Sequence, residues 1–425
     1  MKVVIIGGGW SGVAAAISSK KAGADVTVIE KTDLLLGLGN VGGIMRNNGR
    51  FTASEELIAL GGGELIEITD RVSTHTNIDF PGHKHATLYN VNMIEGEVQK
   101  YLTSLEINLM MESRVNNVKF ENGKIKGVYL SDDTYITGDV FIETTGTTGP
   151  MGNCLRYGNG CSMCILRCPS FGPRISISER CGVADIQGET NNDALGAMSG
   201  SCKLAKESLS QEIRTELDSK GVVVLKVPVE DVNYDKLTTK VCQQYALKEF
   251  AENIILLDTG HAKLMTTYYP LHKLRKIKGL ENAKYVDPYA GSKGNSIRYL
   301  SVAPRTNDLK VTGVDNLFCA GEKSGLFVGH TEAICTGTLA GHNAVRLAMG
   351  MPLLILPSSI AIGDLITYAN EKAKTREGRK DRYTFAGSSY FKRMKELNLY
   401  TTDINEIRER IKKINLDNIF NQKLC

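Results

Sequence analysis

The sequence predicts an α/β fold in which a parallel-sheet domain is interrupted by an inserted α+β domain and followed by a helical region. Strand, glycine-rich turn, helix and strand patterns open the chain, and a further strand, turn and helix appear after residue 314. The length of 425 residues is enough for two or three domains. We expect a discontinuous sheet domain from 1–153 and 301–350, an insert at 154–300 and a C-terminal helical region at 351–425.

Composition and charge are those of an ordinary globular protein, with 42% hydrophobic and 23% charged residues. The net charge of +4 gives no strong nucleic-acid footprint. The apolar N-terminus is broken by glycines and followed by "SSKKAG", unlike a signal peptide. No window reaches the roughly 20 apolar residues of a membrane span. We therefore expect a cytoplasmic protein with no membrane partner, in which cysteines serve metal or redox chemistry more often than structural disulfides.

The first elements form a β-α-β unit. Residues 3–6 are a continuous apolar strand, as expected where a parallel sheet is covered on both faces. A helix is predicted from Ser11 to about Lys21, and "ADVTVIE" forms a second strand that ends at Glu30.

The turn of this unit carries a glycine motif, Gly7-x-Gly9-x-x-Gly12. Gly7 allows a tight turn, Gly9 lets the backbone approach a pyrophosphate, and Gly12 lets helix and strand pack closely. Free N–H groups at the helix start favour the phosphates, and Glu30 can accept hydrogen bonds from a ribose. The motif therefore predicts a dinucleotide site.

The next segments complete the sheet domain. A glycine-rich loop contains Gly42 and Gly43, which we expect to contact the cofactor. Residues 53–105 are expected to be mostly helical, with a polar loop near 73–85. Turn signals at "NGK" and "DDT" then predict an antiparallel meander, followed by a strand, "DVFIETTG", that returns to the main sheet.

The insert is expected to begin with helical runs over 193–220 and a strand at 221–228. The segment "GVDNLFCAGE" then restores a strand and turn of the sheet domain, and 330–350 is a helix rich in small residues, suited to close packing. The remaining chain is helical and becomes basic.

Two further segments identify the dinucleotide as FAD. "DVFIETTG", which ends at Gly146, resembles the strand that covers the cofactor in two-dinucleotide flavoproteins. "VDNLFCAGE", with Gly321 and Glu322, resembles the late strand that brings an acidic residue near the flavin, and Gly329 leads into the next helix. The start of that helix can direct N–H groups at the flavin.

His330 stands at that helix start, where it could hydrogen-bond to flavin or substrate or serve as a structural cap partner. The polar residues after the glycine-rich loop, from Arg46 to Arg50, could meet an anionic substrate or the cofactor phosphates.

Half of the ten cysteines lie between 154 and 181, around "CSMCILRCP". One interpretation is a [4Fe–4S] cluster or a zinc ion on Cys154, Cys161, Cys164 and Cys168. Another is thiol redox chemistry with the flavin, with Cys161, Cys164 and Cys168 as catalytic thiols. A third is a set of small buried side chains, which is the interpretation we favour for isolated cysteines such as Cys242.

The chain resembles the glucose-inhibited-division-A superfamily. The resemblance rests on "GLENAKYV", "NLFCAGEKSGLFVGHTEAICTGTLAGHNAVRLAMGMP" and "LPSSIAIGDLITYAN". It points most to the folate- and FAD-dependent tRNA uridine-54 methyltransferase branch, and it implies an FAD-binding fold whose inserted domain presents substrate to the flavin. In that branch the glycine-rich loop carries a catalytic cysteine, whereas the loop here, "GLGNVGGIMRNNG", has none.

These observations predict an FAD-dependent oxidoreductase whose cysteine segment, 154–181, relays electrons or acts on substrate. The sequence identifies neither the substrate nor the electron donor, for which NAD(P)H and a protein are the candidates; a second GxGxxG after a strand is absent. One alternative is an RNA-uridine-modifying flavoprotein, against which the cysteine-free loop and weak net charge argue. Another is a non-enzymatic FAD-binding protein with a structural metal site.

Overall fold

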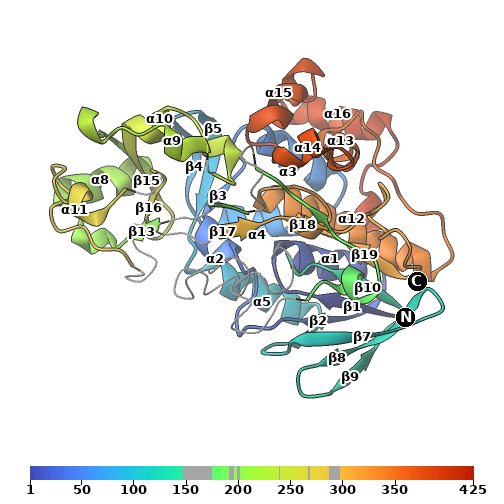
Figure 1. The fold of residues 1–425 in the computed structure, drawn as a ribbon. Coiled ribbons are helices and arrows are strands. Elements are labelled where there is room, and N and C mark those ends of the chain that lie inside the picture. Colours follow the sequence, from blue (N-terminus) through green and yellow to red (C-terminus); the bar gives the residue numbers. More distant parts are fainter. Residues whose placement is uncertain (147–174, 191–195, 199–201, 239, 267–268, 287–296) are drawn as a thin grey trace.

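The central element is a five-stranded parallel sheet (Figure 1). The computed structural model describes residues 1–146, 175–190, 196–198, 202–238, 240–266, 269–286 and 297–425. The strand order is β19-β10-β1-β2-β6, and every neighbouring pair is parallel. The strands are β1 (Lys2–Ile6), β2 (Asp25–Ile29), β6 (Asn108–Met110), β10 (Val140–Glu143) and β19 (Leu317–Cys319). In such a sheet, ligands bind outside the carboxyl ends of the strands.

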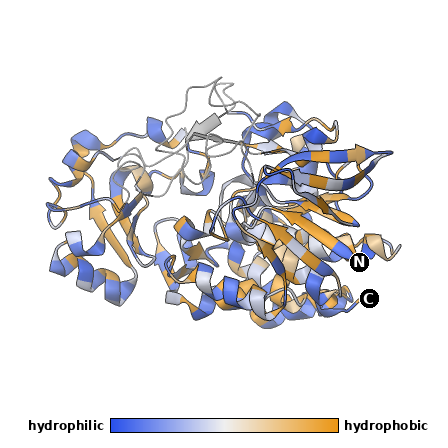
Figure 2. Cartoon of the chain, turned by 90° about the horizontal axis from the view of Figure 1, so that it is seen from below, coloured by the Kyte–Doolittle hydropathy of each residue, from blue (hydrophilic) through white to orange (hydrophobic). Residues whose placement is uncertain are grey.

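The late strand β19 pairs with β10, so residues far apart in sequence share one sheet. Phe141 and Ile142 of β10 are fully buried, like Val3 to Ile5 of β1. The hydropathy colouring in Figure 2 marks the strands of this sheet as largely hydrophobic. The α/β fold with a dinucleotide-binding sheet domain, predicted from the β-α-β pattern, is confirmed.

Helices α1 (Trp10–Lys21) and α12 (His330–Ala348) pack closely together. The Ser18 hydroxyl donates to the Thr338 carbonyl at 2.8 Å, and a Cβ at Gly337 or Gly341 would clash with the α1 backbone. The small residues of α12 therefore bring the N-termini of both helices to the same end of the sheet.

Two antiparallel sheets flank the parallel one. Strands β7 (Val115–Glu121), β8 (Lys124–Leu130) and β9 (Tyr135–Thr137) form the predicted meander. Strands β3 (Ile44–Met45), β5 (His83–Tyr89) and β4 (Ser73–Phe80) form the second sheet.

The expectation of a polar loop near 73–85 is therefore wrong, because this stretch forms most of the β4–β5 hairpin. Most polar side chains of β4 are exposed or half-buried, while Phe80, His83, Ala86 and Leu88 are buried. Helices do flank the hairpin: α3 (Gly49–Ala59), α4 (Glu64–Arg71) and α5 (Ile94–Ser104).

The insert is built on a four-stranded antiparallel sheet with the order β13-β16-β15-β14. Its strands are β13 (Cys202–Leu204), β16 (Ala262–Leu264), β15 (Asn253–Asp258) and β14 (Val222–Lys226). The longer helix is α8 (Gln211–Lys220), with short helices α9 (Asp235–Thr238), α10 (Glu249–Glu252) and α11 (Leu271–Leu274). Short strand pairs, β12 (Gly196–Met198) with β17 (Ile297–Tyr299) and β11 (Ile186–Gln187) with β18 (Ser301–Val302), connect the insert to the sheet domain.

The prediction of helix over 193–220 holds only from Gln211. Upstream of it, the described residues include two short strands, at 196–198 and 202–204, and a 3-10 turn at Lys206–Ser208, because β13 completes the insert sheet beside β16. The α8 boundaries follow local signals: Ser210 caps the N-terminus by accepting from Ile213 N, and Gly221 ends the helix at φ +74°.

The insert rests on the β4–β5 hairpin. Phe80 and Leu88 of the hairpin share one buried cluster with Tyr245, Phe250 and Ile255 of the insert. This packing fixes the insert beside the carboxyl ends of the parallel strands, as Figure 1 shows.

The C-terminal region is helical, as predicted. It comprises α13 (Ala361–Ala373), α14 (Arg376–Lys380), α15 (Ser388–Glu396) and α16 (Ile404–Lys413). The buried Glu56 carboxylate of α3 accepts from the N–H groups of Ala361 and Ile362, which joins this region to the sheet domain. Among the described residues, none of the helices has the length and apolar character that crossing a membrane requires.

Candidate active-site cavity

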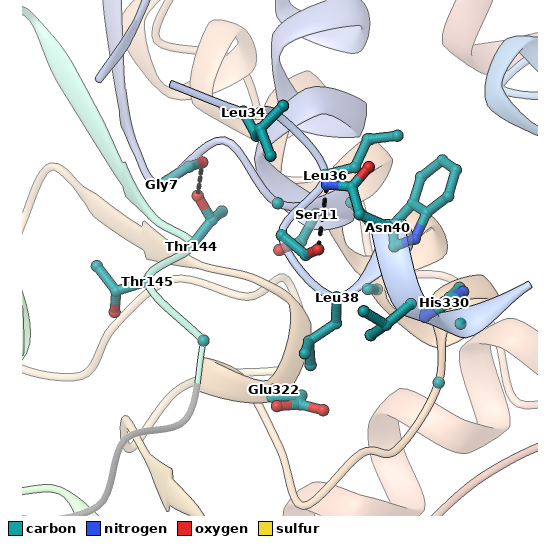
Figure 3. A pocket seen from close by; sticks show the side chains of 18 of the residues that line it. Gly7, Ser11, Leu34, Leu36, Leu38, Asn40, Thr144, Thr145, Glu322 and His330 are labelled. Carbon is teal, nitrogen blue, oxygen red and sulfur yellow. Dashed lines mark hydrogen bonds between the residues drawn. The ribbon is translucent and has the colours of Figure 1, made fainter. Parts of the chain in front are cut away.

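A cavity of about 470 Å³ lies at the carboxyl ends of β1, β2 and β10. Its lining includes the glycine turn and the start of α1, the end of β2, the loop with α2 (Gly39–Gly42), the residues that follow β10 and β19, the start of α12, and residues 240–245 and 263–265 of the insert. Figure 3 shows this cavity with Ser11, Asn40, Thr144, Glu322 and His330 around it. Sheet domain and insert therefore share one site.

The glycine motif has the geometry that a pyrophosphate needs. Gly7 has φ +109°, and a Cβ at Gly12 would clash with the Gly7 carbonyl. A Cβ at Gly9 would meet nothing within 4 Å, and Gly9 lines the cavity. Gly7 thus makes the turn, Gly12 lets the helix pack closely against it, and Gly9 leaves room for a ligand.

Glu30 is held facing the cavity at the end of β2. Its Oε2 accepts from Gly8 N at 2.7 Å, and its Oε1 accepts from Thr32 N at 2.9 Å. Oε1 also accepts from the Thr32 hydroxyl at 3.0 Å, and a carboxylate with about four lone-pair positions keeps room for a further donor. Glu30 can therefore accept a ribose hydroxyl while it remains fixed by these bonds.

The N-termini of both packed helices reach the cavity. Helix α1 has no acidic residue in its first turn and no side-chain cap, so its leading N–H groups and its dipole favour a phosphate there. Gly329 precedes α12 at φ +154°, and a Cβ there would clash with Glu332 and Arg50.

Glu332 and Arg50 form a buried ion pair behind this position. Arg50 Nε lies 3.2 Å from both carboxylate oxygens of Glu332. Glu332 also accepts from Thr384 Oγ1 at 2.7 Å and Phe385 N at 2.9 Å. The pair thus anchors the C-terminal region at the start of α12.

His330 belongs to an aromatic group on the cavity wall. Its Nδ1 lies 3.2 Å from the Tyr89 hydroxyl, and its ring centroid lies 5.7 Å from that of Trp10. A Cβ at Gly42 would clash with the His330 ring, so Gly42 gives this imidazole its space. Gly43 has φ +78° and turns the chain into β3.

Three predicted cofactor residues from later segments reach the same region. Thr144, Thr145 and Gly146 line the cavity after β10, and the Thr144 hydroxyl donates to the Gly7 carbonyl at 2.7 Å (Figure 3). Glu322 lines the cavity from the turn after β19. Gly321 (φ +66°) lies close to Ser11, behind the lining residues.

These features together fit FAD. The turn, the ribose acceptor and two helix N-termini form one continuous lining on the sheet-domain side of the cavity. We refer to this lining as the dinucleotide wall and define it as Gly7, Gly9, Trp10, Ser11, Glu30, Thr144, Gly146, Gly329 and His330.

The insert supplies the facing lining, which we call the insert wall. It consists of Lys240, Cys242, Gln244, Tyr245, Lys263, Leu264 and Met265. Lys263 Nζ donates to the Val41 carbonyl at 2.9 Å, and Lys203 Nζ donates to the Asn40 carbonyl at 3.0 Å. These bonds fasten the insert to the glycine-rich loop.

The two lysines of the insert wall are in an unusual electrostatic setting. Burial, together with the positive charges of Lys203 and Lys240, lowers the pKa of Lys263 to about 7. Burial also lowers the pKa of Lys240 to about 8. Because desolvation and like charges both disfavour an ammonium group, this wall gains stability when an anion is nearby.

The predicted cysteine site falls largely outside the described residues, since Cys154, Cys161, Cys164 and Cys168 all lie between 147 and 174. Cys181 is described and is buried in a hydrophobic cluster, where burial raises its thiol pKa to about 12. Within the described ranges, no three His, Cys, Asp or Glu side chains are placed to hold a metal ion.

The polar residues after the glycine-rich loop serve mainly as structural partners. Arg46 pairs with Asp70 at 2.8 Å, and Asn47 and Asn48 both contact the His83 ring. Of this group only Arg50 lines the cavity.

Sequence patterns do not predict the insert wall. Its members come from a loop near 240–245 and from the region of β16. The sequence favours a small buried role for Cys242, whereas the structure places it on the cavity lining. A lysine within the apolar strand pattern "HAKLM" was the one signal available, because strand lysines are rarely buried without a reason.

The family model named "Glucose inhibited division protein A" matches residues 2–269 and 244–352. A "tRNA uridine 5-carboxymethylaminomethyl modification enzyme MnmG" of Mycoplasma mycoides is 23% identical over 420 residues, covering 86% of this chain and 65% of that protein. A "Methylenetetrahydrofolate--tRNA-(uracil-5-)-methyltransferase TrmFO" of Dictyoglomus turgidum is 38% identical over 104 residues, covering 24% of this chain and 23% of that protein.

A solved structure of Aquifex aeolicus GidA superimposes with a TM-score of 0.62 at 16% identity, covering 97% of this chain and 76% of that one. At this identity the likeness concerns the fold. The matched part of the chain spans 23% of the methyltransferase relative and 65% of the Mycoplasma one.

Proposed function

The chain belongs to the glucose inhibited division protein A family, and on that premise we propose that it is an FAD-dependent oxidoreductase. One observation carries the proposal: a single cavity is lined by a complete dinucleotide wall and, opposite it, by polar side chains of the insert. FAD accepts electrons as a hydride or singly when it is bound. A substrate resting on the insert wall would lie beside it.

The residues of the dinucleotide wall, together with Gly321 and Glu322 of the turn after β19, have distinct roles in this proposal. Gly9 and the start of α1 would hold the pyrophosphate, and Glu30 would orient the ribose. Gly146, Gly321, Glu322 and Gly329 would surround the flavin end. His330, held by Tyr89, would hydrogen-bond to flavin or substrate through its other nitrogen.

The cysteine segment keeps its predicted role within this proposal. Cys161, Cys164 and Cys168 would relay electrons as a dithiol pair or as ligands of a cluster with Cys154. The electron donor would be NAD(P)H or a protein partner.

A second candidate function is tRNA uridine modification, which the names of the relatives favour. The glycine-rich loop of this chain carries no cysteine, so a nucleophile would have to come from elsewhere, and Cys242 lines the cavity. This candidate predicts RNA that co-purifies with the protein and a folate requirement.

The first test is anaerobic purification followed by a visible spectrum and assays of iron, zinc, acid-labile sulfide and RNA. We expect flavin bands that bleach under a chemical or enzymatic reductant and no bound RNA. The chain has one tryptophan, Trp10, on the cavity wall, so FAD added to flavin-free protein should quench its emission. A chain that leaves Trp10 emission unchanged with FAD would contradict the proposal, and folate-dependent methylation of RNA would establish the second candidate.

A further inference from the structure

The insert wall places two lysines on a different part of the cavity lining from the glycine turn. The glycine turn and the start of α1, which suit phosphates, belong to the dinucleotide wall. Lys240 and Lys263 belong to the opposite lining, on a loop and on β16 of the insert. Among the described residues of the insert that line the cavity, none is acidic.

The surroundings of these lysines suit an organic ligand with a charged end. Lys240 Nζ lies 5.5 Å from the Phe250 ring centroid and 6.0 Å from that of Tyr245, within the range of cation–π attraction. Leu264 and Met265 add apolar surface beside Lys263. Lys263 itself is 3% exposed, so a nucleic-acid backbone on the protein surface would not reach it.

A hydrogen-bond acceptor completes this lining. Gln244 is buried and lines the cavity, and its Oε1 has no hydrogen-bond partner among the described residues. An unsatisfied buried acceptor is costly, so this position favours a ligand that carries a donor.

We propose that Lys240 and Lys263 form a subsite that binds the carboxylate of a small organic acid, the substrate class of this enzyme. The proposal rests on the proposed function, since the acid would lie against the flavin. Two ammonium groups that repel each other across a desolvated cavity lose that repulsion when a carboxylate lies between them. The apolar residues would hold the body of the acid, and Gln244 would accept from a hydroxyl or amino group on it.

The test uses benzoate as the probe, on the full chain with its flavin, with calorimetry and the flavin absorption shift as readouts. Benzamide, which has the same shape without charge, is the matched control ligand. We expect benzoate to bind at least about tenfold more tightly than benzamide, the difference that a charge-assisted hydrogen bond commonly makes. Phenyl phosphate, as the phosphate counterpart, is expected to bind more weakly than benzoate.

Variants assign the effect to the two lysines. Lys240→Met and Lys263→Met should each weaken benzoate binding at least about tenfold, and Lys240→Arg and Lys263→Arg should retain most of it. Lys226→Met, at an exposed position at the end of β14, is the matched control and should leave affinity unchanged. Flavin content and melting temperature of each variant show whether it folds.

Four results would overturn the proposal. Equal binding of benzoate and benzamide would remove the role of charge. Unchanged benzoate affinity in both methionine variants would place the anion elsewhere. If the methionine variants fold and bind benzoate as the wild type does but lose FAD, the lysines would be assigned to the cofactor. If they instead lose binding of a uridine-containing RNA, the lysines would be assigned to RNA. Calorimetry works without flavin, so failure of this subsite remains separable from failure to bind FAD.

Discussion

The two walls of the cavity differ in what they are made of. The dinucleotide wall is largely backbone: glycines, helix N-termini and a carboxylate held by N–H groups. The insert wall is made of side chains, two of them lysines with lowered pKa values. Backbone N–H groups and a fixed carboxylate suit the phosphates and ribose of a dinucleotide, whereas lysine side chains suit an anionic group.

The rigidity of the two walls also has different sources. Close contact between α1 and α12 sets the dinucleotide wall, and a Cβ at Gly12, Gly337 or Gly341 would clash with backbone. The insert wall is held by the hairpin contacts of Tyr245 and Phe250 and by lysine bonds to the loop carbonyls of Asn40 and Val41. Substitutions in one wall should therefore affect cofactor and substrate binding separately.

The largest effect is expected from Gly12→Ala. Its new Cβ would meet the Gly7 carbonyl, so the turn must shift and flavin retention should be lost, with a destabilisation of about 1–3 kcal/mol. Flavin content per chain and urea unfolding measure the two effects. Gly96→Ala is the matched control, because Gly96 is also helical and a Cβ there meets nothing within 4 Å. A Gly12→Ala protein with full flavin content would contradict the assignment of this wall.

A smaller effect is expected from pH on the insert wall. The groups that act on Lys263 are Lys203, Lys240, Cys202 and Cys242, and the pKa values of Lys263 and Lys240 are about 7 and 8. When these lysines are neutral, they must take up a proton as benzoate binds. The affinity for benzoate should therefore fall about tenfold between pH 6 and 8.

Calorimetry in two buffers of different ionisation enthalpy would measure this proton uptake directly. Arginine remains charged across the range, so Lys263→Arg should flatten the pH profile. A wild-type affinity that is constant from pH 6 to 9 would show that neither lysine faces the anion.

The smallest effect concerns two buried histidines: His83, which contacts the backbone of the insert wall at Gln244, and His342 of α12, which packs against Phe420. His83 contacts Asn47 Nδ2 at 2.9 Å and the Gln244 carbonyl at 3.0 Å, whereas neither ring nitrogen of His342 has a hydrogen-bond partner among the described residues. His83→Leu should therefore cost about 1–2 kcal/mol by leaving polar groups unsatisfied, and His342→Leu should be close to neutral. Chemical unfolding at pH 7.5 measures the free energy of unfolding of both variants. Equal losses of this free energy would contradict the difference in hydrogen bonding between the two histidines.

Both histidines should also make the fold sensitive to acid. Burial lowers the pKa of His83 to about 3 and that of His342 to about 4. Between these values and the unfolded value of about 6.5, the unfolded chain binds more protons, so stability is present above pH 6.5 and is lost as pH falls. The leucine variants should show a weaker decline between pH 6.5 and 4.

Local sequence patterns predict the sheet domain, which the structure confirms, and they point to the residues that line one side of the cavity. The GxGxxG turn, Glu30 and the strands before Gly146 and Gly321 can be recognised because each depends on backbone conformation within a few residues. The small residues of α12 likewise predict close packing against another helix, which the structure shows with α1. The polar sequence at 73–85 predicts a loop, whereas the structure has a hairpin there. The buried side chains of this hairpin pack against the insert, which is distant in sequence.

The residues of the insert wall come together only in the folded protein. Lys240, Cys242 and Tyr245 lie on a loop, and Lys263 lies on β16, so no local pattern joins them. Their pKa values and their place on the cavity lining arise from packing against the hairpin and the loop at Asn40 and Val41, far away in sequence. Backbone turns are encoded locally, whereas a charged cavity lining depends on which distant segments exclude water from it.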